Sequence, residues 1–182
     1  TGGAATTVTS GVATFAGLSV DKVGSYTLTP TTSVAGVTTL PASGSFAVSA
    51  GTASQLALTT NPVGAASGAA FTTQPVVAIR DAAGNTVTTA TNVVTMTAST
   101  GATVVGTATA TATAGVATFT NVGISGAAGT SYTLTFAATG LTSATQSITT
   151  TAGTASQLAL TTNPAGAASG AAFTTQPVVA IR

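Results

Sequence analysis

The chain has 182 residues and a formal net charge of +1, and only 3% of its residues are charged, whereas about a quarter of an average soluble domain is charged. Three basic side chains cannot neutralise a row of phosphates or hold a chain on an anionic membrane, which excludes nucleic acid and polybasic membrane contacts. No run of about 18 apolar residues is present, so we expect no membrane insertion.

Two-residue alternation of apolar side chains predicts β-strands along the whole chain. In the first part, the alternation changes parity between Phe15 and Leu18, which predicts a bulge or bend beside Gly17. Leu56 and Leu58 share one face of the next clear strand. An Asn-Pro pair ends that strand, because proline cannot donate to a ladder.

Val77 and Ile79 share a face of the strand that follows. The segment Asp81–Asn85 then has turn chemistry, since Gly and Asn tolerate the positive φ of a tight reversal. We expect a hairpin that continues into residues 86–89. Arg80 and the adjacent aspartate are expected to form a solvated ion pair worth under about 1 kcal/mol.

Further strands are predicted in the second half of this region. Val94 and Met96 mark one strand. Residues 107–113 alternate threonine with alanine, which places the threonines on one face of another. Beside Asn121 the parity of the apolar positions changes again, so a second bulge or bend is expected there.

The most strongly patterned strand contains Tyr132, Leu134 and Phe136, and Ile148 lies in the last one. No segment has the 3.6-residue period of a helix, and the many Gly and Thr residues disfavour helix, so helix content should be close to zero. About seven strands result, as in an immunoglobulin-like sandwich. The expected core consists of Leu56, Leu58, Val77, Ile79, Phe119, Tyr132, Leu134 and Phe136.

The chain contains a long internal repeat. Residues 51–80 recur at 153–182 with one substitution, so the period is 153 − 51 = 102 residues. A second pairing supports a period near this length, because Gly11–Phe15 recurs at Gly115–Phe119, at an offset of 115 − 11 = 104 residues. A period near 100 residues is too long for a solenoid coil and matches one complete β-sandwich.

The repeat predicts three parts of unequal completeness. Residues 1–50 are expected to hold the later strands of one repeat, residues 51–152 a complete repeat, and residues 153–182 the early strands of the next. Neither partial repeat can close a sandwich by itself, and exposed ladders are templates for pairing. We therefore expect either a longer continuous chain or head-to-tail completion between copies.

Two segments carry a family resemblance. Asp81–Asn85 matches an acidic-x-x-Gly-Asn hairpin, and Gly115–Phe119 matches a Gly-Val-Ala strand entry. In their order and spacing they resemble the bacterial immunoglobulin-like repeats of invasin-type and intimin-type adhesins and related giant surface proteins. The resemblance covers essentially the whole chain. It implies an all-β, immunoglobulin-like β-sandwich in tandem repeats, which serves as an extracellular spacer with binding activity often in a separate terminal domain.

The inventory of reactive side chains argues against catalysis. The chain has no His and no Cys, and its two carboxylates, Asp21 and Asp81, lie in non-equivalent turns. General acid–base catalysis needs a titratable group near the reacting atoms, and a serine nucleophile needs a base. Isolated aspartates also supply too few oxygen ligands for calcium. We expect no enzyme activity, no cofactor and no metal site.

Thr107, Thr109, Thr111 and Thr113 are the candidate functional side chains. Outward threonines are candidate sites of O-glycosylation. An ordered threonine array can also bind ice or a crystalline surface, but a single strand does not make a ladder. The simplest interpretation is a solvent-facing strand built from residues with good β propensity.

These observations predict a structural repeat module of an extracellular or cell-surface microbial filament or adhesin stalk, which acts as a rigid spacer and assembly unit. The alternative is a carbohydrate- or surface-binding module that uses threonine-rich strand faces. Clustered exposed aromatic residues would favour the alternative, and the aromatic residues here occupy expected core positions. The expected partners are neighbouring copies, through head-to-tail or strand-complemented contacts, or adjacent repeats in a longer chain, with glycans as further candidates.

Overall fold

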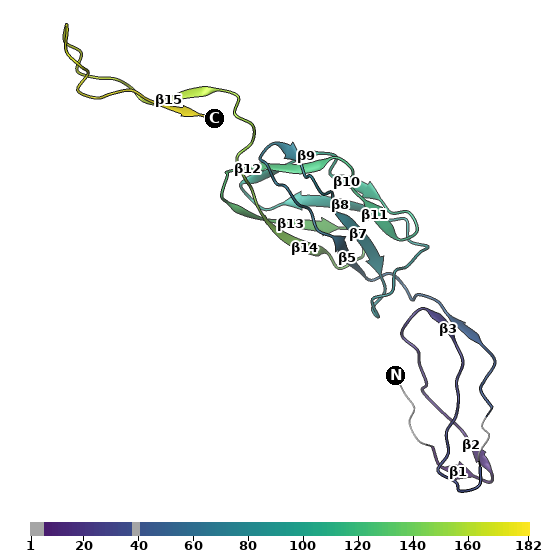
Figure 1. Cartoon of the computed structure of the whole chain (residues 1–182). Coiled ribbons are helices and arrows are strands. Elements are labelled where there is room, and N and C mark those ends of the chain that lie inside the picture. Colours follow the sequence, from purple (N-terminus) through teal and green to yellow (C-terminus); the bar gives the residue numbers. More distant parts are fainter. Residues whose placement is uncertain (1–5, 38–40) are drawn as a thin grey trace.

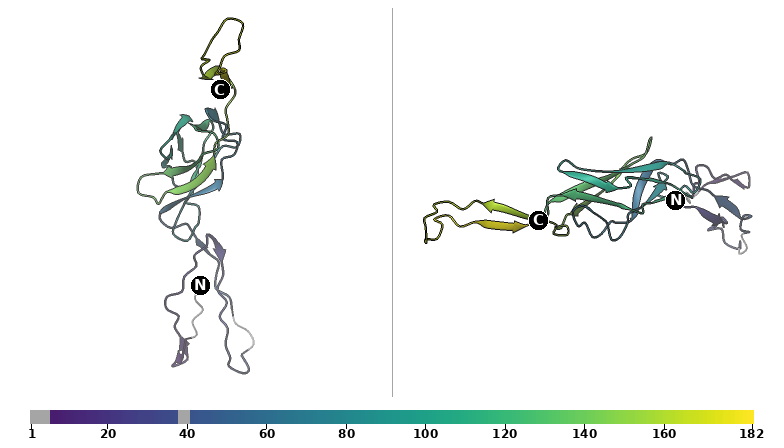
Figure 2. Two further views of the ribbon diagram at one scale, coloured as in Figure 1. Left: turned by 90° about the vertical axis from the view of Figure 1, so that its left-hand side faces the viewer. Right: turned by 90° about the horizontal axis from the view of Figure 1, so that it is seen from above.

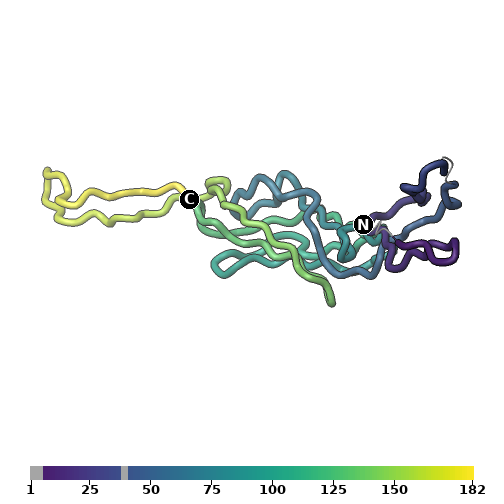
Figure 3. Tube along the Cα trace, turned by 90° about the horizontal axis from the view of Figure 1, so that it is seen from below, coloured from purple at the N-terminus to yellow at the C-terminus, as the bar shows by residue number. Residues whose placement is uncertain are grey.

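The computed structural model describes residues 6–37 and 41–182, and all regular structure in these ranges is β. The prediction of an all-β fold without helix is confirmed for this part of the chain. A central β-sandwich lies between an N-terminal segment and a C-terminal hairpin, which extend from its opposite ends (Figure 1). The views in Figures 2 and 3 show the same extended arrangement.

The strands are short and divide among these three parts. The N-terminal segment contains β1 (Val8–Thr9), β2 (Val12–Ala13), β3 (Gly24–Tyr26) and β4 (Phe46–Val48). The central sandwich contains β5 (Gln55–Thr60), β6 (Ala69–Ala70), β7 (Val76–Arg80), β8 (Val93–Ala98), β9 (Ala102–Gly106), β10 (Thr109–Thr111), β11 (Val116–Thr118), β12 (Val122–Gly126), β13 (Ser131–Ala137) and β14 (Ala144–Thr149). The C-terminal hairpin contains β15 (Leu158–Thr162) and β16 (Val178–Ile181).

The central sandwich has two layers. One layer is a four-stranded sheet in the order β10-β8-β13-β14. The other consists of two three-stranded sheets in the orders β11-β7-β5 and β6-β12-β9. The named strands of the central sandwich all pair antiparallel. Such sheets bury one face and leave the other to solvent, which explains the two-residue alternation of the sequence.

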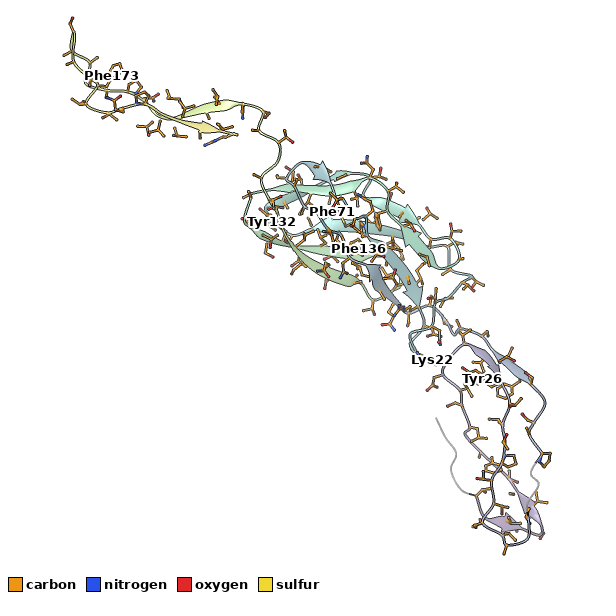
Figure 4. All side chains as sticks on the ribbon, in the orientation of Figure 1. Lys22, Tyr26, Phe71, Tyr132, Phe136 and Phe173 are labelled. Carbon is orange, nitrogen blue, oxygen red and sulfur yellow. The ribbon has the colours of Figure 1, made fainter. Side chains whose placement is uncertain are left out.

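The core between the layers is formed by the predicted apolar positions. Seven of the eight predicted core residues are buried, and Leu58 packs against the core while partly exposed. Phe119 and Phe136 make an edge-to-face contact with ring centroids 5.6 Å apart, a geometry that aromatic pairs prefer. Figure 4 places Phe71, Tyr132 and Phe136 inside the central sandwich.

Tyr132 fixes the turn that precedes β13. Its phenol oxygen accepts a hydrogen bond of 2.9 Å from the backbone N–H of Ala127. A β-carbon at Gly126 would lie 2.6 Å from the Tyr132 ring, so only glycine fits there without a shift. Immunoglobulin-like sandwiches have a similar contact between a tyrosine hydroxyl and the upstream backbone.

The parity change near Asn121 has a different cause from a bulge. Thr118 ends β11, which pairs with β7, and Val122 begins β12, which pairs with β9. The chain therefore bends and passes from one sheet to another, so the inward-facing set shifts. The register irregularity in this layer lies elsewhere, between Leu58 and Thr60.

The expected hairpin into residues 86–89 forms only in part. Thr86 pairs back with Arg80 as an isolated bridge, and no strand follows it. Within the reversal, Gly84 has a positive φ of 83° and Asn85 does not. The ladder stops because Val87 and Ala90 turn into the core, where both are buried.

Identical sequences have the same strand register but very different burial. Leu158 pairs with Ile181, as Leu56 pairs with Ile79. Leu158 and Ile181 are 71% and 74% exposed, whereas Leu56 and Ile79 are 5% and 0% exposed. The register is therefore set by the local sequence, and the burial depends on the rest of the sandwich. The division of the chain at residues 50/51 and 152/153 stays a prediction.

The two isoleucines form a matched pair for a stability test. Ile79→Ala is expected to lower the free energy of unfolding by about 2–5 kcal/mol, because it leaves a cavity in the core. Ile181→Ala, in the same sequence context but exposed, should change it by less than about 0.5 kcal/mol. Urea unfolding followed by circular dichroism measures both. Equal effects of the two substitutions would contradict the assigned burial.

Candidate functional site

Two turns that are far apart in the sequence meet at one end of the central sandwich. We call this contact the junction; it comprises the turn Asp21–Val23, Gly51 and the hairpin Asp81–Asn85. The Asn85 side-chain amide donates 2.7 Å to the carbonyl of Asp21, and its oxygen accepts a 3.2 Å bond from the N–H of Val23. The Lys22 ammonium donates 2.7 Å to the carbonyl of Ala83. Figure 4 places Lys22 at this end.

Asp81 holds the buried half of the junction, because it is only 4% exposed. Its carboxylate accepts three N–H bonds: from the backbone of Gly51 (2.8 Å), from the backbone of Asn85 (2.8 Å) and from the Asn85 side-chain amide (2.9 Å). The expected solvated ion pair with Arg80 is therefore wrong. The carboxylate lies in a cradle of N–H donors because the reversal folds back over it.

These hydrogen bonds lower the pKa of Asp81 from 3.8 to about 2. The Asn85 side chain contributes most, and the Gly51 N–H is next. Burial acts in the opposite direction, because it disfavours the charged form. The carboxylate therefore has a structural role. It accepts hydrogen bonds from Gly51, where the chain enters the central sandwich, and from Asn85 in the hairpin.

The chain leaves the central sandwich at the other end. Thr151 donates its N–H to the carbonyl of Ala65 (2.9 Å) and accepts 3.0 Å from the N–H of Ser67. Gly153 follows, and a β-carbon there would lie 2.5 Å from the Ser67 carbonyl. Entry at Gly51 and exit at Thr151 are therefore both anchored by hydrogen bonds. The N-terminal segment and the C-terminal hairpin extend from opposite ends of the sandwich (Figure 1).

The outer surface of the four-stranded sheet carries mainly hydroxyl groups. We call this surface the hydroxyl face. Its outward side chains come from alternate positions of β10, β8, β13 and β14, as the register and the burial pattern indicate. They are Thr109, Thr111, Val93, Thr95, Thr97, Ser131, Thr133, Thr135, Ala137, Thr145, Ser147 and Thr149.

Strand register aligns these hydroxyls in rows across the sheet. Thr97, Thr135 and Thr145 form one row across three strands. Thr109 lies opposite Thr95 in the next row. Directly opposite residues have Cβ atoms about 5 Å apart. The face is therefore a two-dimensional hydroxyl array rather than a single stripe.

All four sequence-predicted threonines are exposed, but they do not all lie in a strand. Thr109 and Thr111 belong to β10. Thr107 lies before it and donates its backbone N–H to the carbonyl of Asn121. Thr113 lies after it and forms an isolated bridge with Val116.

Sequence reasoning missed the hydroxyls of β8, β13 and β14. Their signal was present, because Thr or Ser occupies most of the alternate positions in all three strands. What alternation does not reveal is that the three strands and β10 lie side by side in one sheet, with their hydroxyls on the same outer surface.

A shallow depression lies at one border of the hydroxyl face. Its volume is about 350 Å³, and it is lined by Val93, Thr95, Ala137, Ala138 and Thr139. These side chains are small and carry no charge, so the depression offers hydroxyls and methyl groups only. Nowhere in residues 6–37 and 41–182 do three or more His, Cys, Asp or Glu side chains gather as metal ligands would. Over the same ranges, no helix is long and apolar enough to cross a membrane.

No family model matches the sequence, and no curated protein matches it. Among solved structures, a glycosyl hydrolase family 2 member from Bacteroides cellulosilyticus is 17% identical with a TM-score of 0.44, over 60% of this chain and 16% of that chain. The β-glucuronidase of Parabacteroides merdae is 14% identical with a TM-score of 0.40, over 56% of this chain and 13% of that one. The chain thus spans about a sixth of the length of the first of these enzymes.

Asp81→Asn tests the carboxylate cradle through pH. The folded-state pKa is depressed, so this group contributes stability above its ordinary pKa of 3.8 and loses that contribution as the pH falls towards about 2. Asparagine has an NH₂ group in place of one carboxylate oxygen, and this group cannot accept a hydrogen bond from the N–H donors of the cradle. We expect a lower melting temperature at pH 7 and a smaller fall between pH 3.8 and about 2 than in the parent chain. Calorimetry measures both. Asp21→Asn is the control. If the melting temperature of Asp81→Asn fell with pH as steeply as that of the parent chain, the cradle would be contradicted.

Asn85→Ala tests the junction as an orienting contact. It removes the side-chain bonds to Asp21, Val23 and Asp81. The chain has no cysteine, so cysteines introduced at the exposed positions 47 and 145 take spin labels uniquely. Electron–electron distance measurements should give a broader distribution in Asn85→Ala. Asn121→Ala is the control because its exposed side chain lies away from the junction. Unchanged widths would mean that the hydrogen bonds do not set the orientation.

Proposed function

We propose that this chain is a structural repeat module of an extracellular or cell-surface microbial filament or adhesin stalk. In this role each sandwich acts as a rigid, non-catalytic spacer and assembly unit. The observation that carries the proposal is the path of the chain. The N-terminal segment and the C-terminal hairpin join the central sandwich at opposite ends (Figure 3), so repeated modules add length rather than bulk.

Two further observations support a spacer. A near-identical stretch of 30 residues recurs at a period of 153 − 51 = 102 residues, and nearest-neighbour contacts determine the stiffness of such tandem arrays. The junction supplies a contact of this kind between successive parts of the chain. In the junction, the buried Asp81 carboxylate holds the backbone of Gly51. The exposed hydrogen bonds of Lys22 and Val23 are individually weak.

The partners that fit this role are neighbouring copies of the chain or adjacent repeats in a longer chain. Both would extend the array along the path that the chain takes through the central sandwich.

The alternative of a carbohydrate- or surface-binding module has less support. Stacking platforms for sugars are built from exposed aromatic rings, because the rings bury apolar area against a ligand. Phe71, Phe119, Tyr132 and Phe136 are all buried in the core of the central sandwich, and the hydroxyl face contains no aromatic residue.

The spacer proposal is tested by lengthening the chain. A second copy of residues 51–152 is inserted after residue 152 of the full chain, and small-angle scattering compares the two proteins. The maximum dimension is expected to increase by the length of one sandwich, while the cross-sectional radius stays constant. An increase in cross-section without added length would mean that neighbouring modules fold back on each other, and the spacer proposal would fail.

A further inference from the structure

The central sandwich presents almost no charge to solvent. Between residues 51 and 152 the charged side chains are Arg80 and Asp81. Asp81 is buried in its cradle of N–H donors, and Arg80 is half-buried, with an Nε atom that has no partner among the described residues. A protein surface with a net charge near zero favours association and precipitation. Another source of surface hydration is needed if this module is to stay dispersed.

The hydroxyl face carries hydroxyls that the fold does not use. Within the described ranges, Thr97 has the only hydroxyl of this face that forms a hydrogen bond, a long one of 3.5 Å to the carbonyl of Thr135. A few threonines elsewhere differ in this respect. The hydroxyls of Thr59, Thr72 and Thr150 each donate to a backbone carbonyl. The chain therefore has threonines whose hydroxyls are free and threonines whose hydroxyls are engaged in structure, and the hydroxyl face brings many of the free ones together on one surface.

We propose that the hydroxyl face is a site of O-glycosylation, in which threonine Oγ1 atoms of β8, β10, β13 and β14 carry sugars. The face has what an acceptor surface needs: exposed hydroxyls, small neighbouring side chains and no charge. Sugars there would project away from the core, because the opposite side of each strand holds the buried residues. The hydrated sugars would then supply the surface hydration that charged side chains supply in other proteins.

The reaction is a glycosyl transfer by a separate transferase. The Oγ1 atom of threonine forms a bond to the anomeric carbon of an activated sugar, which is a nucleotide sugar or a lipid-linked sugar phosphate. The bond from that carbon to the phosphate oxygen breaks, and the phosphate leaves with the electron pair. The hydroxyl proton passes to a base of the transferase. No electrons are gained or lost, and the activated sugar is the only co-reactant.

The geometry limits which positions are modified together. Thr109 and Thr95 lie directly opposite each other, with Cβ atoms about 5 Å apart. Thr135 and Thr145 form a second opposed pair. A sugar ring on one member covers the other, so each pair should carry one glycan at most. A free threonine without an opposed hydroxyl, such as Thr111 opposite Val93, has no such restriction.

Mass spectrometry of the protein isolated from its native source tests the proposal. We expect peptides that cover residues 93–113 and 131–149 to carry mass increments of whole sugar residues. Electron-transfer fragmentation should place them on free threonines such as Thr95, Thr111 or Thr133. Mild alkali should remove each sugar by β-elimination and leave a dehydrated residue that marks the site. The engaged residues Thr59, Thr72 and Thr150 are the internal controls.

Two results would overturn the proposal. The first is a complete set of these peptides at their unmodified masses in the native protein. The second is sugar on the engaged threonines as often as on the free ones, since this would mean that the hydroxyl face is not selected. Neither result bears on the chain-lengthening experiment, so the two proposals fail separately.

Discussion

Burial of one side of the strands in the central sandwich is the interaction on which the rest of this structure depends. The chain has no cysteine for disulfides and only five charged side chains, so apolar burial and backbone pairing must supply most of the stability. The duplicated stretch separates these two contributions. In β15 and β16 the register of β5 and β7 is retained, yet Leu158 and Ile181 remain exposed. Strand pairing is thus determined by the local sequence, but the apolar side chains become buried only where a second sheet packs against them.

Asp81 is the polar exception within this apolar design. A buried carboxylate is costly unless hydrogen bonds replace its hydration, and three N–H groups from Gly51 and Asn85 do so. The same bonds tie the linker to the hairpin and, through Asn85, to the preceding turn at Asp21. The hydrogen bonds to Asp81 therefore offset the cost of burying its carboxylate, and they also fix the path of the chain between the N-terminal segment and the central sandwich. The proposed spacer role needs a fixed entry of this kind more than it needs a binding pocket.

The hydroxyl face is the outward counterpart of the same alternation. Strands β8, β10 and β13 bury apolar side chains at alternate positions and present mostly threonine or serine between them, as in Met96 beside Thr97. Threonine suits both demands, because its branched carbon favours the strand and its hydroxyl faces water. The outcome is a surface that is polar, uncharged and regular. Charge and aromatic rings are the features that many binding surfaces use, and this face has neither.

The sequence by itself determined the all-β class, most of the core and the turn at Asp81–Asn85, because alternation and turn chemistry act over a few residues. It also located Thr107–Thr113 as an exposed, threonine-rich segment. Other features were decided by tertiary structure: the passage between sheets near Asn121, the missing strand after Thr86, the cradle around Asp81 and the extent of the hydroxyl face. Each of these depends on which distant segments become neighbours. A local pattern states which side of a strand is apolar, but only the assembled sheets determine what that side meets.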